Sequence, residues 1–183
     1  QSQIIYPEDS SEYQYFGESI TLSNENILVG DSGMNKYLPH QLTYDSVTNG
    51  SVYVFSLYKE NLSWYQSQKI VAPESFSGDS FGSQVDLSDN AAVFSAPSPY
   101  LISNNAVIGL DTGSAFLYLK GEDDLWRFES VLSPSDPFGA CHYGPICSSR
   151  SGFGDAVAIY GGDIVIGMGK WSKKTNEIHP DGR

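Results

Sequence analysis

Two serines stand in stretches that resemble the nucleophile segments of hydrolases. Residues 78–82 read Gly-Asp-Ser-Phe-Gly, which matches the Gly-x-Ser-x-Gly motif around a catalytic serine, and residues 30–32 read Gly-Asp-Ser. The first motif needs a helix after its turn, but an alternating, strand-like run follows Ser80. No histidine stands in an obvious partner motif. We therefore expect both segments to serve the fold, and we predict no catalytic residue and no enzymatic activity.

Cys141 and Cys147 lie in the Gly- and Pro-containing segment Cys-His-Tyr-Gly-Pro-Ile-Cys. Two cysteines at this spacing can close a small disulfide ring or form half of a metal site. No second Cys/His pair at zinc spacing follows, because His40 and His179 are far away in the sequence. The pattern favours a disulfide between Cys141 and Cys147, a bond that persists in oxidising, extracellular surroundings.

The chain also contains two Asn-x-Ser sequons, at Asn49 and Asn61. Both asparagines precede or lie in predicted loops, where a glycosyltransferase can reach them. We expect one or both to carry a glycan if the chain passes through a eukaryotic secretory pathway. Together with the cysteines, the sequons indicate an extracellular or cell-surface location.

The composition excludes several classes of partner. A net charge of −12 argues against nucleic acid and against anionic membrane surfaces, which need a basic protein surface. No stretch approaches the roughly 20 apolar residues of a membrane span, so we expect no membrane insertion. The remaining partners are a protein or glycan ligand, or neighbouring subunits of an extracellular assembly.

A Phe-Gly pair recurs along the chain, at Phe16, Phe81 and Phe153, with spacings of 81−16 = 65 and 153−81 = 72 residues. Each pair is followed by an alternating run, a polar turn and a short apolar run that ends in small residues. A self-similar period of this length predicts a repeat architecture.

The first two repeat units each predict four strands, and the third predicts two. The first unit has them at 16–22, 27–30, 50–55 and 64–73, the second at 81–87, 91–95, 113–118 and 126–134, and the third has two, at 153–159 and 164–167. Residues 1–7 echo 66–73 and predict the outer strand of a preceding unit, and 97–112 is a long connection. The predicted organisation is therefore 1–15 (outer strand and linker), 16–73 (unit), 74–134 (unit) and 135–183 (cysteine loop and first half of a further unit).

Four antiparallel strands per unit in a tandem array predict an all-β fold of β-propeller blades, about two and a half of them. No segment of ten or more residues shows helical periodicity. A β-sandwich is the alternative, but it does not need the same order of motifs repeated. Since closed propellers typically use about four to eight blades, we expect either a fragment of a longer polypeptide or open faces covered by neighbouring subunits.

These motifs resemble the FG-GAP repeats of integrin α-subunit propellers, and more closely the related tandem repeats of secreted and cell-surface proteins. The matching elements are the Phe-Gly strands, the small-residue ends of the second strands, Gly-Ser-Val-Tyr-Val-Phe at 50–55, and Trp-x-x-x-Gln-Lys-Ile-x-Ala-Pro at 64–73. The resemblance covers most of the chain apart from the long loops. It implies a propeller fold and an extracellular role.

The turns between the first and second strands depart from the integrin pattern. Calcium-binding integrin blades carry acidic residues at alternate positions there, because calcium needs six or more oxygen ligands. The three turns here, 23–26, 88–90 and 160–163, offer too few carboxylates. We expect no calcium at these turns and no cofactor.

The long predicted loops, 31–49, 97–112 and 135–152, belong to one end of an up-and-down blade, and short turns belong to the other end. This end is the predicted interaction face. Its candidate residues are Tyr37, His40, Tyr44, Tyr100, His142 and Tyr143. Trp64 and Trp126 recur at the start of the outer strand, where we expect them to cover a neighbouring blade.

The leading hypothesis is a non-enzymatic extracellular module, part of an FG-GAP-like β-propeller that acts in adhesion or in assembly of a surface structure through its long-loop face. One alternative is an accessory propeller of a larger secreted hydrolase, because similar propellers accompany phospholipases. Another is a glycan-binding propeller that uses exposed tyrosines.

Overall fold

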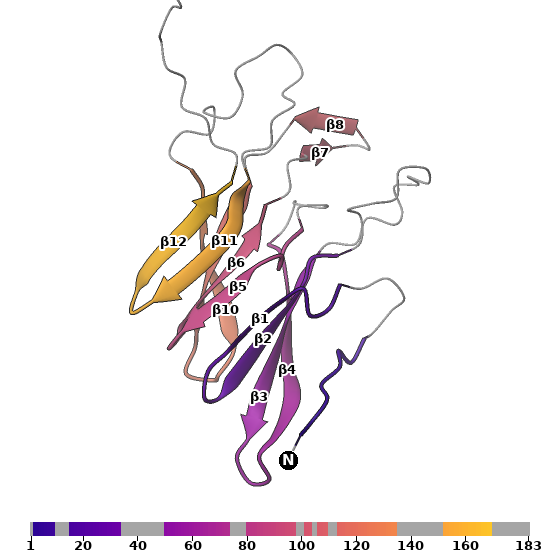
Figure 1. Ribbon diagram of the computed structural model, residues 1–183, viewed down its shortest axis with the longest axis vertical. Helices are drawn as coiled ribbons and strands as arrows, with labels where there is room; N and C mark the ends of the chain where they lie inside the picture. The colour runs from indigo at the N-terminus through magenta and orange to yellow at the C-terminus, as the bar shows by residue number, and fades with distance from the viewer. Residues whose placement is uncertain are drawn as a thin grey trace, which may run out of the picture.

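The computed structural model describes residues 2–9, 15–33, 50–73, 80–97, 101–103, 106–109, 113–134 and 152–169, with the backbone alone for 101–103 and 106–109. Every regular element in these ranges is a β-strand, from β1 to β12, and every strand pairing is antiparallel. The strands form two four-stranded sheets and two two-stranded sheets (Figure 1). The all-β prediction is therefore confirmed.

The first sheet, blade 1, has the strand order β1-β2-β3-β4, so each strand pairs with the next one in the chain. Its strands are β1 (Ser19–Leu22), β2 (Asn26–Asp31), β3 (Ser51–Tyr58) and β4 (Ser63–Val71). The two middle strands, β2 and β3, are rich in Val, Ile, Leu and aromatic residues, which suit a sheet buried on both faces. The β3–β4 ladder has one irregularity, between Val54 and Phe55, where Ser67 of β4 is the extra residue.

The second sheet, blade 2, repeats this topology with β5, β6, β9 and β10. Its strands are β5 (Val85–Ser88), β6 (Ala91–Ala96), β9 (Ser114–Lys120) and β10 (Trp126–Leu132). The β9–β10 ladder has an irregularity at the matching place, with Glu129 as the extra residue between Phe128 and Ser130. A bulge in the same position of both outer strands confirms that the two sheets are copies of one unit.

The connection between β6 and β9 contains a hairpin that the sequence reading missed. β7 (Leu101–Ser103) and β8 (Ala106–Gly109) pair with each other and with no other described strand. The prediction of a connection without structure of its own over 97–112 is thus wrong in part. The hairpin is attached at the end of the blade where β6 finishes and β9 begins (Figure 1).

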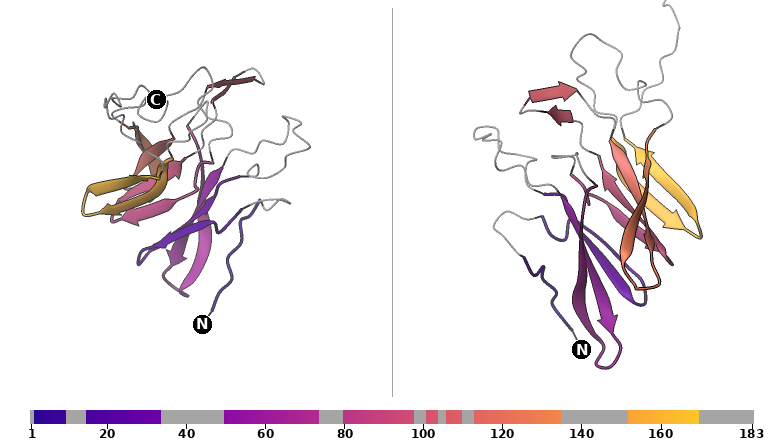
Figure 2. Two further views of the ribbon diagram at one scale, coloured as in Figure 1. Left: turned by 45° about the horizontal axis from the view of Figure 1, so that its top comes forward. Right: turned by 180° about the vertical axis from the view of Figure 1, so that it is seen from behind.

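A third unit begins with β11 (Phe153–Tyr160) and β12 (Asp163–Met168), which form a two-stranded sheet next to blade 2. Figure 2 shows blade 1, blade 2 and this β11–β12 sheet following one another side by side in both views. Two four-stranded blades and the two inner strands of another are the partial propeller that the repeat predicts.

The outer strand predicted at 1–7 belongs to a preceding unit, of which the structure describes no other strand. Residues 2–7 have no ladder partner among the described strands. Side chains hold the segment against blade 1 instead: the Gln3 amide bonds to the backbone of Trp64, and the Glu8 N–H donates to Gln66 Oε1 at 2.9 Å. Pro7 ends the segment and has no N–H to donate to a ladder. The missing ladder leaves the predicted strand untested, because the strands that would pair with it belong to the preceding unit.

The hydrophobic core consists of layers between successive blades. Blade 1 contributes one face and blade 2 the facing one to the largest layer, whose buried residues are Leu28, Val52, Val54, Ile70, Phe81, Val85, Ala92, Phe94, Ala96, Phe116, Tyr118 and Trp126. A second layer joins blade 2 to the β11–β12 sheet through Val93, Ala115 and Ile159. Burial of apolar area between blades, rather than within one sheet, therefore holds the array together.

Candidate interaction surface and the blade junctions that support it

The two ends of the blades differ in how the chain connects them. At one end the strands are joined by short turns, which span 23–25, 59–62, 89–90, 121–125 and 161–162. At the other end, β2 leads to β3 and β6 leads to β9 through the longer segments, and each blade passes to the next (Figure 1). This second end is the loop end, and the predicted interaction face corresponds to it.

The residues predicted for that face lie outside the described residues. This holds for Tyr37, His40, Tyr44, Tyr100, His142 and Tyr143, and also for Cys141, Cys147 and Asn49. The disulfide and the glycan on Asn49 remain predictions. Asn61 is described, and it lies on the exposed β3–β4 turn at the opposite, short-turn end.

A turn that contains the Phe-Gly pair stands at the start of the innermost strand of each unit. In each turn the N–H of the fourth residue donates to the carbonyl of the first: Glu18 to Tyr15 (3.0 Å), Ser83 to Ser80 (3.1 Å) and Asp155 to Gly152 (2.9 Å). The glycine of the pair has a positive φ in all three units, for example +84° at Gly82. Glycine adopts this conformation without steric cost, which explains why the pair recurs.

The same glycine brings two backbones together across each blade junction. A Cβ on Gly82 would lie 2.5 Å from the carbonyl oxygen of Ser51 in blade 1, and a Cβ on Gly50 would overlap the backbone of Phe81. At the next junction a Cβ on Gly113 would overlap the carbonyl of Phe153. The Phe-Gly pair of one unit thus docks on the Gly-Ser pair that starts the third strand of the preceding unit.

Phe81 fills the space beside this backbone contact. Its ring is 1% exposed and lies 5.8 Å from Phe94, 5.4 Å from Phe116 and 6.4 Å from Tyr118, measured between ring centroids. Burial raises the pKa of the Tyr118 hydroxyl to about 12. The face of blade 2 that packs on blade 1 therefore carries a closed aromatic cluster.

Asp86 links the innermost strands of all three units. Its Oδ1 accepts hydrogen bonds from Thr21 Oγ1 of blade 1 (3.0 Å) and from the Leu87 N–H (2.9 Å). Its Oδ2 accepts one from the N–H of Ile159 in β11 (2.9 Å). A single carboxylate thus bridges β1, β5 and β11, and no sequence motif marks this residue.

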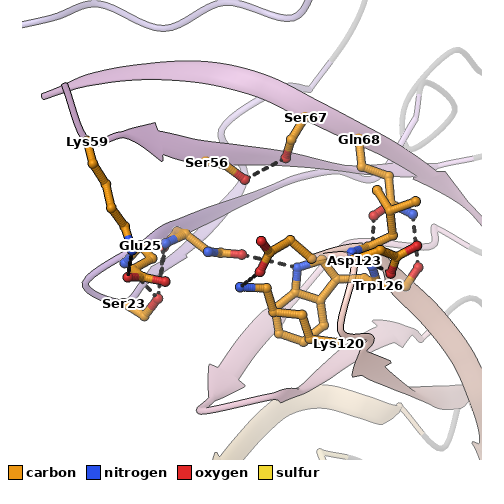
Figure 3. Close-up of polar contacts among 12 residues, drawn as sticks. Ser23, Glu25, Ser56, Lys59, Ser67, Gln68, Lys120, Asp123 and Trp126 are labelled. Atoms are coloured by element: carbon orange, nitrogen blue, oxygen red, sulfur yellow. Dashed lines mark hydrogen bonds and ion pairs between the residues drawn. The ribbon is translucent and has the colours of Figure 1, made fainter. Parts of the chain in front are cut away.

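The outer strands are joined by a glutamine clasp, a contact in which a Gln side-chain amide pairs with the backbone of a Trp in the next unit. Gln68 Nε2 donates to the Trp126 carbonyl and the Trp126 N–H donates to Gln68 Oε1, both at 2.9 Å (Figure 3). Gln3 makes the same two bonds with Trp64, at 2.7 and 2.8 Å. The repeated Gln-Ser-Gln at 1–3 and 66–68 was the signal that could have revealed this contact.

Trp126 covers blade 1, as the sequence predicted. Its side chain is 2% exposed within the layer between blades 1 and 2, and its indole Nε1–H donates to Asn26 Oδ1 at 3.3 Å. Trp64 is half-buried and packs against the cluster of Val29, Tyr53 and Phe55 on the other face of blade 1. Both tryptophans are packing residues in the structure.

The two serine segments have structural partners. Ser32 Oγ donates to Glu18 Oε2, and Asp31 Oδ1 accepts from the N–H of Tyr15 (2.9 Å) and of Gly33 (3.1 Å). Ser80 has a positive φ of 55°, but it starts the repeated turn and is followed by β5 rather than by a helix. The Ser80 segment therefore lacks the strand–turn–helix setting of a nucleophile elbow.

The short-turn end carries exposed ion pairs. Arg127 donates to Asp123 Oδ1 at 2.7 Å, and this pairing lowers the pKa of Asp123 to about 2. In blade 1, Lys59 and Glu25 pair at 2.6 Å, which raises the pKa of Lys59 and lowers that of Glu25 (Figure 3). Such exposed pairs contribute little to stability, because water and salt screen them.

Within the described ranges, no group of three or more His, Cys, Asp and Glu side chains has the arrangement of a metal site. The same ranges contain no helix long and apolar enough to cross a membrane.

The fold and its junctions define a β-propeller-type protein built from tandem four-stranded blades. Comparison with protein families gives a match to the FG-GAP repeat over residues 1–55 and again over 64–118, together more than half of the chain. The chain belongs to the FG-GAP repeat family. No curated protein matches it.

Proposed function

We propose that this chain is a non-enzymatic, extracellular interaction module, and that it acts in adhesion or in assembly of a surface structure through its loop end. The partner is a protein or glycan ligand or a neighbouring subunit. One observation carries the proposal: the long connections attach at one end of the blades, while the opposite end is closed by short turns. Binding residues are concentrated on loops that a rigid scaffold positions.

The blade junctions support the proposal because they make such a scaffold. Backbone contacts at Gly50 and Gly82, the Asp86 bridge and the Gln68 clasp fix neighbouring blades at their centre and at their outer edge. Loops that begin on different blades are then held at constant separations, which lowers the entropic cost of binding a large partner.

The lack of enzymatic activity is part of the proposal. Its support is that Ser32 and Ser80, the serines in nucleophile-like segments, are engaged in turns and in contacts within the blade. The strongly acidic composition supports a partner that is neither nucleic acid nor an anionic membrane.

Loop replacement tests this proposal. In one variant, residues 35–48 are replaced by a short Gly/Ser linker; in the control variant, Glu122 and Asp124 on the short-turn end are changed to Ala. Purified proteins are assayed for binding to cultured cells, to an array of extracellular proteins and to a glycan array. We expect binding to cells or extracellular proteins that is lost in the loop variant and kept in the control.

Binding that survives the loop replacement but is lost in the control would contradict the proposal. Binding confined to the glycan array would identify a glycan-binding propeller in place of a protein-binding one. Circular dichroism on both variants checks that the blades remain folded.

A further inference from the structure

The β3–β4 turn presents a sequon together with two exposed aromatic rings. Tyr58, at the end of β3, and Tyr65, in β4, are 46% and 50% exposed, and their ring centroids lie 6.4 Å apart at an interplanar angle of 80°. Asn61 stands between them in the chain, on the exposed turn. Large aromatic rings that remain half in water and adjoin a modification site need an explanation beyond the blade core.

The turn has the geometry of an accessible acceptor. The Leu62 N–H donates to the Tyr58 carbonyl at 2.9 Å, and Leu62 has a φ of +56°. Asn61 Oδ1 accepts from the N–H of Ser63 at 3.1 Å and from its hydroxyl at 2.6 Å. Both bonds use the amide oxygen, and within the described residues no hydrogen bond engages the Asn61 amide nitrogen.

We infer that Asn61 is an N-glycosylation site and that the first sugar of its glycan packs on the Tyr58–Tyr65 ring pair. This inference rests on the extracellular location in the proposed function. In the covalent step, Asn61 Nδ2 forms a bond to the anomeric carbon of a lipid-pyrophosphate-linked oligosaccharide. The bond from that carbon to the pyrophosphate oxygen breaks, the lipid pyrophosphate leaves with the electron pair, and the amide proton passes to base.

The rings suit a sugar for three reasons. The face of an aromatic ring is electronegative and attracts the polarised C–H groups on the apolar face of a pyranose. The hydroxyl of Tyr58 donates to Glu60 Oε2 at 3.2 Å, so it is held beside the turn. Tyrosine also loses little conformational entropy when it forms a contact.

The test uses the full chain with Asn49→Gln, secreted from a eukaryotic cell by an added leader sequence, so that only Asn61 can be modified. Peptide mass mapping should find the glycan at Asn61 and find none in a Ser63→Ala variant. Thermal unfolding then compares the glycoprotein after two treatments: an endoglycosidase that leaves the first sugar and an amidase that removes it.

We expect the endoglycosidase to leave Tm unchanged and complete removal to lower Tm by about 3 °C, from the loss of one aromatic contact in a chain of this size. In a Tyr58→Ala/Tyr65→Ala variant, complete removal should lower Tm by less than about 1 °C. Because the amidase converts Asn61 to Asp, an Asn61→Asp variant made without glycan controls for the new charge.

An unmodified Asn61 in secreted protein would overturn the site. An equal loss of Tm with and without the two tyrosines would overturn the ring contact. The added leader supplies the secretory route, so neither result depends on where the native chain resides or on whether its loop end binds a partner.

Discussion

Phe16-Gly17 and Phe81-Gly82 are the same element of two repeat units in different surroundings. Phe81 is 1% exposed and Gly82 lies against Ser51 of blade 1, whereas a Cβ on Gly17 would meet nothing within 4 Å. Both glycines nevertheless have similar φ values, +95° and +84°. The local turn is therefore encoded in each repeat by itself, and the neighbouring blade adds the tight backbone contact.

The strands that follow show the same contrast. In β5, Val85 is 7% exposed and Leu87 packs on the layer between blades 1 and 2, but at the matching positions of β1, Ile20 and Leu22 are 59% and 70% exposed. The side chains have nearly the same chemistry. The Phe-Gly strand is therefore suited to contact with the blade that precedes it, and its contribution to stability depends on that neighbour.

The largest expected effect separates the two phenylalanines. Phe81→Ala should lower the free energy of unfolding by about 3–5 kcal/mol, because it opens a cavity in a closed aromatic cluster. Phe16→Ala removes a half-buried ring that contacts Tyr53 and Phe55 and should cost about 1–2 kcal/mol. Urea unfolding of both variants measures the difference. Equal losses in the two variants would contradict the predicted contrast between the two phenylalanines.

Substitutions of two glycines separate the cost of disturbing the junction from the cost of straining the turn. Gly50→Ala places a methyl group into the backbone of Phe81 at an ordinary φ, so its whole cost is the clash across the junction, about 2–3 kcal/mol. Gly17→Ala strains φ alone, in open space, and should cost about 1 kcal/mol. Denaturant midpoints compare the two variants; a larger loss for Gly17→Ala would show that the turn, not the junction, dominates.

Much of this architecture could be predicted from the sequence, because the alternating apolar runs and the repeat order are local signals. Trp126 was correctly read as a packing residue for the same reason. The Gln68 clasp and the Asp86 bridge could not be found, since a polar residue in a strand normally indicates an exposed position and its partner lies about one unit away in the sequence.

The strand predicted at 1–7 stays a prediction, because the structure describes no other strand of the preceding unit. One feature of the fold was missed, and its signal can be identified. The β7–β8 hairpin was signalled by two short apolar runs around Asn104 and Asn105, which are favourable turn residues. The loop-end residues of the candidate site, such as Tyr37 and His40, lie outside the described residues, so they stay predictions.

The two glutamine clasps are expected to differ less in their contribution to stability than the two phenylalanines or the two glycines. Gln68→Glu keeps the size of the side chain but removes its N–H donor to the partly buried Trp126 carbonyl, and should cost about 1–2 kcal/mol. Gln3→Glu removes the same donor at an exposed contact and should cost about 0.5 kcal/mol or less. Thermal unfolding at neutral pH measures both. A Gln68→Glu protein as stable as the wild type would show that the clasp is incidental.

The smallest effect concerns the turns at the short-turn end. Arg127 lowers the pKa of Asp123 to about 2, so the ion pair adds stability above about pH 4 that is lost as the pH falls toward 2. Both groups are exposed, so the effect is small and declines with salt. Carboxyl titration by NMR should show the Asp123 pKa returning toward its ordinary value in Arg127→Gln. An unchanged titration would contradict the assignment.

Hydrogen exchange can show whether the Phe-Gly pair acts by docking one blade on the preceding one. Amide exchange is compared among the wild type, Gly50→Ala and Gly17→Ala under native conditions. We expect Gly50→Ala to accelerate exchange on both sides of the junction, in β3 and in β5, and Gly17→Ala to affect only its own turn and β1. Faster exchange confined to β3 in Gly50→Ala, with β5 unchanged, would contradict it.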